Sequence, residues 1–242
     1  GSGCARDSQF ALIAAADLDG LRQWALRDPA TTAKVDSAVR GADLVLWQRA
    51  VGGPKNDWAY AMTATRDGGL ATAGRTENRS AGREDLYVVR LDAAGERLWE
   101  ATFGGAETDR GRTIVETRDG GLVVAGATES QGAGAYDVWV LKLDADGTLL
   151  WERTFGGPGT DWASAVIETA DGGVAVGAYT ENGENGSYDF WILKLDASGA
   201  RIWEVTRGGP ALDWINAIAE TADRGLVAVG DTESKGAGGA DM

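Results

Sequence analysis

A 52-residue repeat constrains this chain more than any other feature of its sequence. Tryptophan recurs at this step, and two aspartate series and one threonine series keep the same register. The four series are Trp47, Trp99, Trp151 and Trp203; Asp57, Asp109, Asp161 and Asp213; Thr76, Thr128, Thr180 and Thr232; and Asp85, Asp137, Asp189 and Asp241. A repeat of this length predicts an architecture assembled from like structural units.

Each repeat reads as four short strands. In the third repeat we expect strands over 163–170, 174–180, 189–196 and 200–206. The turns "DGG" and "ASG" supply the positive φ angles that tight hairpins need. The third strand, "DFWILKLD", is largely apolar on both of its alternating faces, so each small sheet is expected to be covered on both sides.

These features predict an all-β fold, a β-propeller with four-stranded antiparallel blades. The chain holds three complete units plus partial blades, and we expect a short α-helical segment before them. The 36 glycines and 10 tryptophans among 242 residues fit such a fold. A solenoid of stacked hairpins is the alternative architecture.

The partial units leave the ring unfinished. Before the first complete unit the sequence offers only a fourth-type strand, at 43–53, and the fourth unit stops where its third strand would begin. Closure as four blades by this chain alone is therefore not expected, because an outer strand cannot pair across a missing neighbour. Either the chain is a fragment of a larger propeller, which we favour, or another copy or another protein supplies the strand.

The segment before the repeats differs in composition. We divide the chain into residues 1–42, a tag remnant with a helical segment, and residues 43–242, the propeller. Apolar stripes and a cap predict the helices: Phe10, Leu12 and Ile13; Leu21, Trp24 and Ala25; and Thr31 or Thr32 at the start of a helix ending near Gly41. Cys4 follows "GSG", which reads as a cloning remnant, although "SGC" also matches a lipidation signal.

The repeat unit resembles a family of bacterial β-propeller repeats. The resemblance rests on "GGPGTDW", "DGGVAVGAYTE" and "YDFWILKLDASG", and it covers residues 43–242. Arg110 departs from it, standing where other units have tryptophan, and so does Arg207, where two units have phenylalanine. The resemblance implies a propeller, often on exported bacterial proteins, and no particular activity. It favours the cell envelope or the extracellular space over the cytoplasm without fixing the compartment.

Composition excludes several functions. The formal charge of −14 argues against binding to nucleic acid or to an anionic membrane surface. With no histidine and one cysteine, the chain has no Ser/His/Asp or Cys/His machinery and none of the usual zinc ligand sets. No apolar run is long enough to span a bilayer. "LDADG" at 143–147 reads as a hairpin turn rather than a calcium loop, and we expect no metal and no cofactor.

Candidate binding residues lie at positions that vary between the repeats. They fall in two slots near one end of the blades: Trp58, Arg110, Trp162 and Trp214 in the first, and Arg75, Ala127, Tyr179 and Asp231 in the second. A constant frame with variable positions suits a binding surface, although drift of solvated loops explains the same variation. The recurring aspartates from Asp57 and tryptophans from Trp47 are expected to be structural.

We therefore expect a non-catalytic module that presents a loop-rich face to a protein or glycan partner. One alternative is a self-assembling structural propeller whose unfinished blade is completed in trans. A second is a carboxylate-based glycoside hydrolase or lyase, for which an acid present in a single repeat, such as Asp231, would be the candidate. No catalytic residue is assigned.

Overall fold

The computed structural model describes residues 10–15, 45–78, 80–181 and 187–235, and in them the chain forms sixteen β-strands and no helix. The strands are β1 (Phe10–Ala15), β2 (Val45–Val51), β3 (Asp57–Ala64), β4 (Leu70–Thr76), β5 (Asp85–Leu91), β6 (Arg97–Phe103), β7 (Asp109–Glu116), β8 (Leu122–Thr128), β9 (Asp137–Leu143), β10 (Leu149–Phe155), β11 (Asp161–Glu168), β12 (Val174–Thr180), β13 (Asp189–Leu195), β14 (Arg201–Arg207), β15 (Asp213–Glu220) and β16 (Leu226–Thr232).

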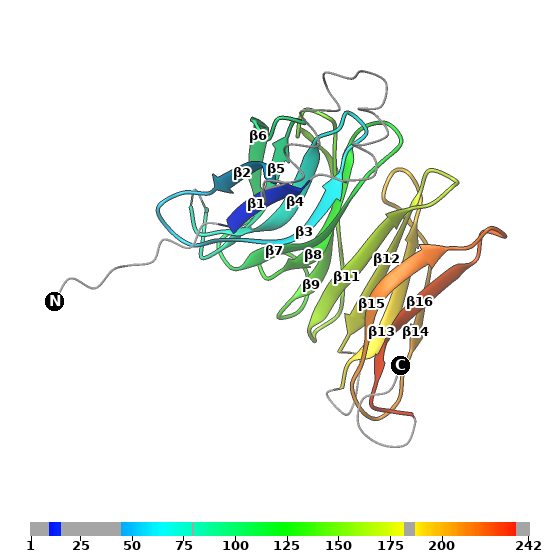
Figure 1. The fold of residues 1–242 in the computed structure, drawn as a ribbon. Helices are drawn as coiled ribbons and strands as arrows, with labels where there is room; N and C mark the ends of the chain where they lie inside the picture. The colour runs from blue at the N-terminus through cyan, green and yellow to red at the C-terminus, as the bar shows by residue number, and fades with distance from the viewer. Residues whose placement is uncertain (1–9, 16–44, 79, 182–186, 236–242) are drawn as a thin grey trace.

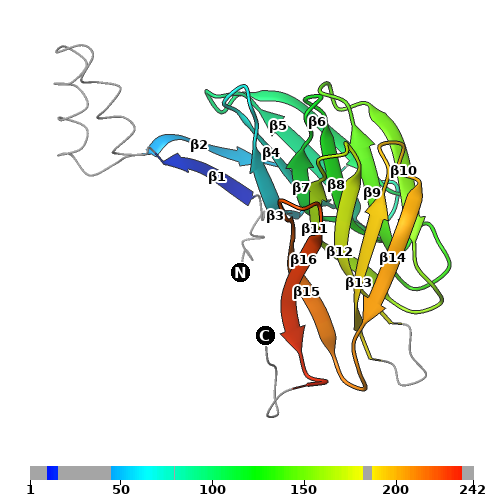
Figure 2. The same cartoon turned by 90° about the vertical axis from the view of Figure 1, so that its right-hand side faces the viewer.

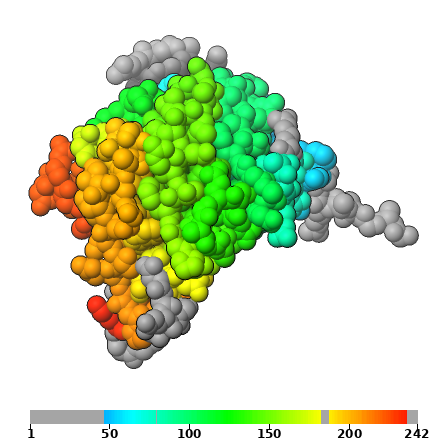
Figure 3. Space-filling model, turned by 180° about the vertical axis from the view of Figure 1, so that it is seen from behind, coloured from blue at the N-terminus to red at the C-terminus, as the bar shows by residue number. Residues whose placement is uncertain are grey.

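Twelve strands form three antiparallel sheets of four, which we call blade 1 (β3–β6), blade 2 (β7–β10) and blade 3 (β11–β14). Each blade is a meander in which neighbours in sequence are neighbours in the sheet. The blades stand side by side in chain order, with the two-stranded sheets β1–β2 and β15–β16 at the two ends of the array (Figure 1). From behind, the units appear as adjacent bands in the same order (Figure 3). The prediction of four strands per repeat is confirmed.

The predicted helical segment before the repeats is wrong where the structure describes it. Phe10, Leu12 and Ile13 belong to a strand, β1, which pairs antiparallel with β2 (Figure 2). An apolar run this short has no decisive periodicity, and the open edge of β2 supplies hydrogen-bond partners for its backbone as a strand. The other predicted helices, at 21–25 and from 31 or 32 to 41, lie outside the described residues.

The hydrophobic cores lie between blades. Ala71, Ala73 and Leu86 of blade 1 pack with Ile114 and Val124 of blade 2 in one buried cluster. A second cluster joins blades 2 and 3 in the same way. The first strands of successive blades also contact one another, so β3, β7, β11 and β15 line the inner side of the array. Because both faces of a blade are covered by its neighbours, both faces of its two middle strands can be apolar, as in β5, β8 and β9.

The recurring tryptophans join each unit to the next. Their indole N–H groups donate to carbonyl oxygens in the hairpin turn of the following blade: Trp47 to Ala93 at 3.2 Å, Trp99 to Ala145 at 2.9 Å and Trp151 to Ala197 at 3.1 Å. The turn glycines Gly95, Gly147 and Gly199 have positive φ and leave room for the indole rings. Tryptophan thus recurs every 52 residues because each of these side chains contacts the neighbouring unit.

Candidate functional site

The two predicted slots of binding residues form a single row in space. In every unit the two residues are direct cross-strand partners on the first and second strands: Trp58 and Arg75, Arg110 and Ala127, Trp162 and Tyr179, and Trp214 and Asp231. The register follows from the Asp–Thr pair that precedes it, such as Asp161 opposite Thr180. Each unit therefore offers one variable pair at the same end of its sheet.

Between blades 1 and 2 the predicted residues Arg75 and Arg110 share one acid, Glu84, which was not predicted. Glu84 pairs with Arg75 at 2.6 Å and with Arg110 at 2.9 Å, and all three side chains are largely shielded from solvent. The Arg75 guanidinium also lies 3.8 Å from the ring centre of Trp58. Two cations share this one carboxylate, and one of them lies on an indole ring, so the three charged side chains form an ionic cluster among themselves.

Between blades 2 and 3 an aromatic pair replaces the ionic cluster. Tyr136 holds the position that Glu84 has in the first unit, and its ring centre lies 4.8 Å from that of Trp162. The guanidinium of Arg110 lies 5.8 Å from the Trp162 ring. The same frame therefore carries different chemistry at successive boundaries.

Between blade 3 and β15–β16 the row opens into an aromatic cleft of about 360 Å³. Its lining includes Trp162, Tyr179, Tyr188 and Trp214, with Tyr179 and Tyr188 in edge contact at 5.1 Å. Burial raises the pKa of the Tyr179 hydroxyl, so this group stays protonated at neutral pH. We call this space the aromatic cleft. A cleft of this size with aromatic walls is a common ligand-binding geometry.

Three further polar side chains of the cleft come from β-bulges. Each first strand has a bulge at the same step, which leaves one unpaired residue per unit: Tyr60, Arg112, Ser164 and Asn216. Arg112, Ser164 and Asn216 line the cleft. Sequence reasoning missed these residues, although they also recur at 52 residues and differ in every unit. Bulges of this kind often redirect a side chain beside a binding site.

Asp231 joins the site through a neighbour. Its carboxylate accepts a hydrogen bond of 2.6 Å from the Asn216 amide, which fixes the orientation of that amide beside the cleft. Of the seven predicted binding residues, Trp162, Tyr179 and Trp214 line the cleft. Arg75, Arg110 and Trp58 belong to the ionic cluster.

The recurring aspartates hold the loops that enter each blade. Their carboxylates accept the backbone N–H of the second glycine of each Gly-Gly pair, as Asp161 does from Gly157 at 2.9 Å. Burial raises the pKa of Asp161. Burial also disfavours the charged form of Asp213, but the hydroxyls of Ser234 and Thr232 outweigh it and lower that pKa. In the part of the chain that the structure describes, no three acidic or thiol groups cluster as metal ligands would.

One family model agrees with the repeat architecture. A model of the family described as "Domain of unknown function (DUF5122) beta-propeller" matches residues 117–149, the segment that holds β8, β9 and the turns around them. This match supports placing the chain among β-propeller repeat proteins. Over the described ranges no helix is long and apolar enough to cross a membrane.

One curated relative is Regulatory protein FlaEY of Caulobacter vibrioides, 24% identical over 165 residues, which are 58% of this chain and 17% of that protein. Among solved structures, Sqt1 from Chaetomium thermophilum is 15% identical, with a TM-score of 0.43 over 73% of this chain and 41% of that one. A protein of unknown function from Bacteroides caccae is 13% identical, with a TM-score of 0.33 over 67% of this chain and 71% of that one. Neither structure carries an argument about function.

Proposed function

We propose that this chain is a non-catalytic binding module whose ligand site is the aromatic cleft, and that the ligand is a glycan. The observation that carries the proposal is the grouping of four aromatic side chains with Ser164 and Asn216 around one opening. Aromatic faces pack against the apolar face of a sugar ring, while hydroxyl and amide groups match its hydroxyls.

The charges near the cleft favour a neutral glycan over a charged peptide. Arg112 is the one cation of the lining, and the carboxylate of Asp231 is engaged by Asn216. A site for a charged peptide would need several free charges of one sign, whereas a neutral sugar needs hydrogen-bonding groups beside an aromatic wall.

The acids near this row support a non-catalytic role. Glu84 is held between Arg75 and Arg110, and Asp231 is held by Asn216, so these two acids, each present in one unit alone, already have side-chain partners. Glycoside hydrolysis needs an acid and a base on either side of one bond. The regulatory name of the bacterial relative also supports binding rather than chemistry.

The test is binding of the chain to a panel of neutral oligosaccharides, followed by calorimetry on any that bind. Trp214→Ala is expected to weaken binding at least about tenfold, because it removes one aromatic wall. Asn216→Ala, at an exposed position, is expected to weaken it with the fold intact. Leu150→Ala, on the outer strand β10, is the control and leaves binding unchanged.

Two results would contradict the proposal. Binding that survives both cleft variants would place the site elsewhere, and no binding to any glycan would turn the search to a protein partner. Shortened oligosaccharides after prolonged incubation, detected by chromatography, would show that the chain is an enzyme rather than a non-catalytic binding module.

A further inference from the structure

The sheet β1–β2 has the register of the outer half of a blade. Phe10 opposes Val51 as Leu86 opposes Phe103 in blade 1, and Val51 and Phe103 are one repeat apart. The register shift also recurs, between Ala14 and Ala15 in β1 and between Arg90 and Leu91 in β5. β1 therefore occupies the place of a third strand beside the fourth-type strand β2.

The sheet β15–β16 is the matching inner half. Asp213 opposes Thr232 at one end of this sheet, and Glu220 opposes Leu226 at the other. β15 also has the bulge that the first strand of each complete blade has. In the three complete blades the second strand pairs with a third strand on its other edge. Among the described strands, β16 pairs with β15 alone, so its other edge presents backbone groups without a strand partner.

The two ends of the array expose apolar side chains whose equivalents are buried elsewhere. Val227 and Val229 on β16 are 54% and 53% exposed, whereas the equivalent Ala71 and Ala73 of blade 1 are fully buried. On the first strand of blade 1, Met62 is 67% exposed. Its equivalent in blade 2, Ile114, is buried against Ala71 and Ala73 of blade 1.

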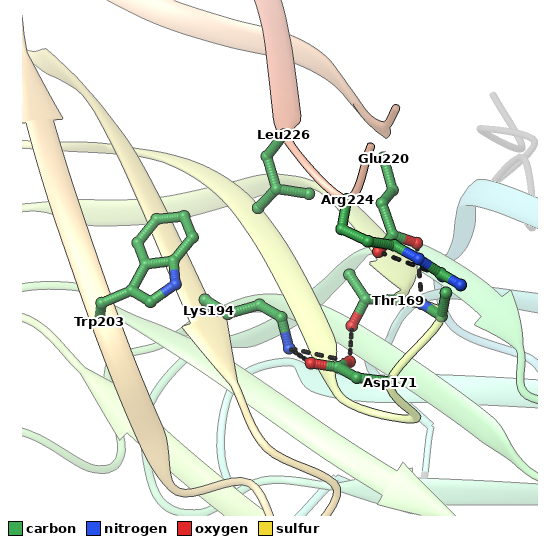
Figure 4. Close-up of a pocket in the computed structure, with 8 residues that line it drawn as sticks. Thr169, Asp171, Lys194, Trp203, Glu220, Arg224 and Leu226 are labelled. Atoms are coloured by element: carbon green, nitrogen blue, oxygen red, sulfur yellow. Dashed lines mark hydrogen bonds and ion pairs between the residues drawn. The ribbon is translucent and has the colours of Figure 1, made fainter. Parts of the chain in front are cut away.

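The last recurring tryptophan has an open space beside it. Trp203 on β14 is 43% exposed, whereas Trp99 and Trp151 each cover the hairpin of the next blade. A cavity of about 400 Å³ lies here, with Trp203 on one side and Leu226 of β16 across from it (Figure 4). It corresponds to the space that the outer half of a following blade fills elsewhere in the array.

We propose that the β1–β2 sheet of one copy of this chain pairs with β16 of a second copy and completes a four-stranded blade shared between them. Within one chain the two halves are separate sheets at opposite ends of the array, with three blades between them (Figure 1). A second copy can supply the missing half at each end of the array. Two copies related by a twofold axis make two such blades at once.

The shared blade also covers the exposed apolar side chains. Val227 and Val229 of one copy meet Met62 of the partner subunit, in the arrangement that Ala71 and Ala73 have with Ile114 between blades 1 and 2. The shared blade places its third strand, β1, on the side of the array where Trp203 lies. The strand register and the exposed apolar surface therefore both favour a second copy of this chain as the partner.

The first test is the mass of the 242-residue chain in solution, measured by light scattering over a dilution series. Twice the mass of one chain or more is expected, and the mass of a single chain at all concentrations would overturn the proposal. Val229→Lys is expected to shift the mass to one chain with an unchanged circular dichroism spectrum. Leu150→Lys, at a position of similar exposure on β10, keeps the larger mass. A larger mass that survives Val229→Lys would mean association through another surface.

The second test separates pairing between copies from closure within one copy. The register of β4–β5, in which Ala71 opposes Arg90, places Val227 opposite Ala14 in the shared blade. Chains carrying Cys4→Ser with Val227→Cys are mixed with chains carrying Cys4→Ser with Ala14→Cys and then oxidised. A disulfide-linked pair containing one chain of each kind is expected. Its absence, or crosslinking only when both cysteines lie in the same chain, would contradict pairing between copies.

Discussion

Each complete blade buries a cation in its third strand and neutralises it with an aspartate from its own "DGG" turn. The pairs are Arg90 with Asp67 at 2.6 Å, Lys142 with Asp119 at 2.8 Å, and Lys194 with Asp171 at 3.0 Å. The third pair is visible beside Trp203 in Figure 4. In each case the cation is buried while the aspartate is largely exposed, so the carboxylate shields the cation at the end of the sheet.

The pair in blade 2 predicts a dependence of stability on pH. Burial alone would raise the pKa of Asp119, but hydrogen bonds from Lys142, Thr117 and Gly121 lower it to about 2. Ionised Asp119 therefore stabilises the fold above pH of about 4, and this contribution is lost as the pH falls toward about 2. Asp119→Asn is expected to lower the free energy of unfolding at pH 7 by about 1 kcal/mol, because the buried ammonium of Lys142 loses a counterion that solvent partly screens.

Urea unfolding from pH 7 to pH 2 measures this effect. The difference in stability between wild type and Asp119→Asn is expected to shrink toward the acid end. Asp146→Asn, an exposed carboxylate in the turn between β9 and β10, serves as the control and leaves the profile unchanged. An equal loss for both variants at every pH would contradict the role assigned to Asp119.

The sequence predicted these turns but not their ion pairs. "DGG" indicates a tight turn whatever the aspartate contacts, and Lys194 appeared only as a polar residue within an apolar strand. Their contact joins positions 23 residues apart across two strands, which local pattern does not encode. The cleft illustrates the same limit, since the variable slots were visible in the sequence but the bulge residues beside them were not.

At the scale of elements, the loops that enter the blades depend on one glycine each. The first glycine of the pair lies between an aspartate of its own blade and one of the next: Gly104 between Asp85 and Asp109, Gly156 between Asp137 and Asp161, and Gly208 between Asp189 and Asp213. A Cβ atom at Gly156 would lie 2.0 Å from Asp137 Oδ1 and 2.5 Å from Asp161 Oδ2. The loop can pass between the carboxylates only without a side chain.

Gly156→Ala is therefore expected to lower the free energy of unfolding by about 1–3 kcal/mol through overpacking. The adjacent Gly157→Ala is a matched control, because a Cβ atom there meets no atom within 4 Å. Thermal unfolding of both variants measures the difference. Similar melting temperatures for the two would show that the carboxylates move aside at little cost.

Elements were predictable where the repeat defines them. The strands and turns of the three complete blades follow from alternation, Asp-Gly turns and the 52-residue step. β1 was not predictable, because its six residues lie outside the repeat and their pairing with β2 is a contact between segments far apart in the chain. The bulges are equally hidden, because an extra residue in one strand is visible only against its partner.

At the scale of the whole molecule, one frame carries different chemistry at successive boundaries. An ionic cluster closes the boundary between blades 1 and 2, an aromatic pair the next, and the aromatic cleft follows. The buried clusters between blades and the Gly-Gly loops recur, so the variable positions can change with little effect on the frame. The stacking of the units was predictable from their apolar faces. The cleft was not, because it depends on how the four aromatic side chains pack between blade 3 and β15–β16.

The tryptophan contacts between units have a consequence for synthesis of the chain on the ribosome. Each indole N–H finds its acceptor 46 residues further along the chain, always toward the C-terminus. At roughly 5–20 residues per second, the acceptor is made about 2–9 s after the tryptophan. A nascent chain thus carries one uncovered indole of this series for most of each repeat, until the next hairpin emerges and covers it. The translation rate sets how long each indole stays uncovered and open to chaperones. A pause between a tryptophan and its acceptor prolongs this exposure more than a pause after the acceptor has been made.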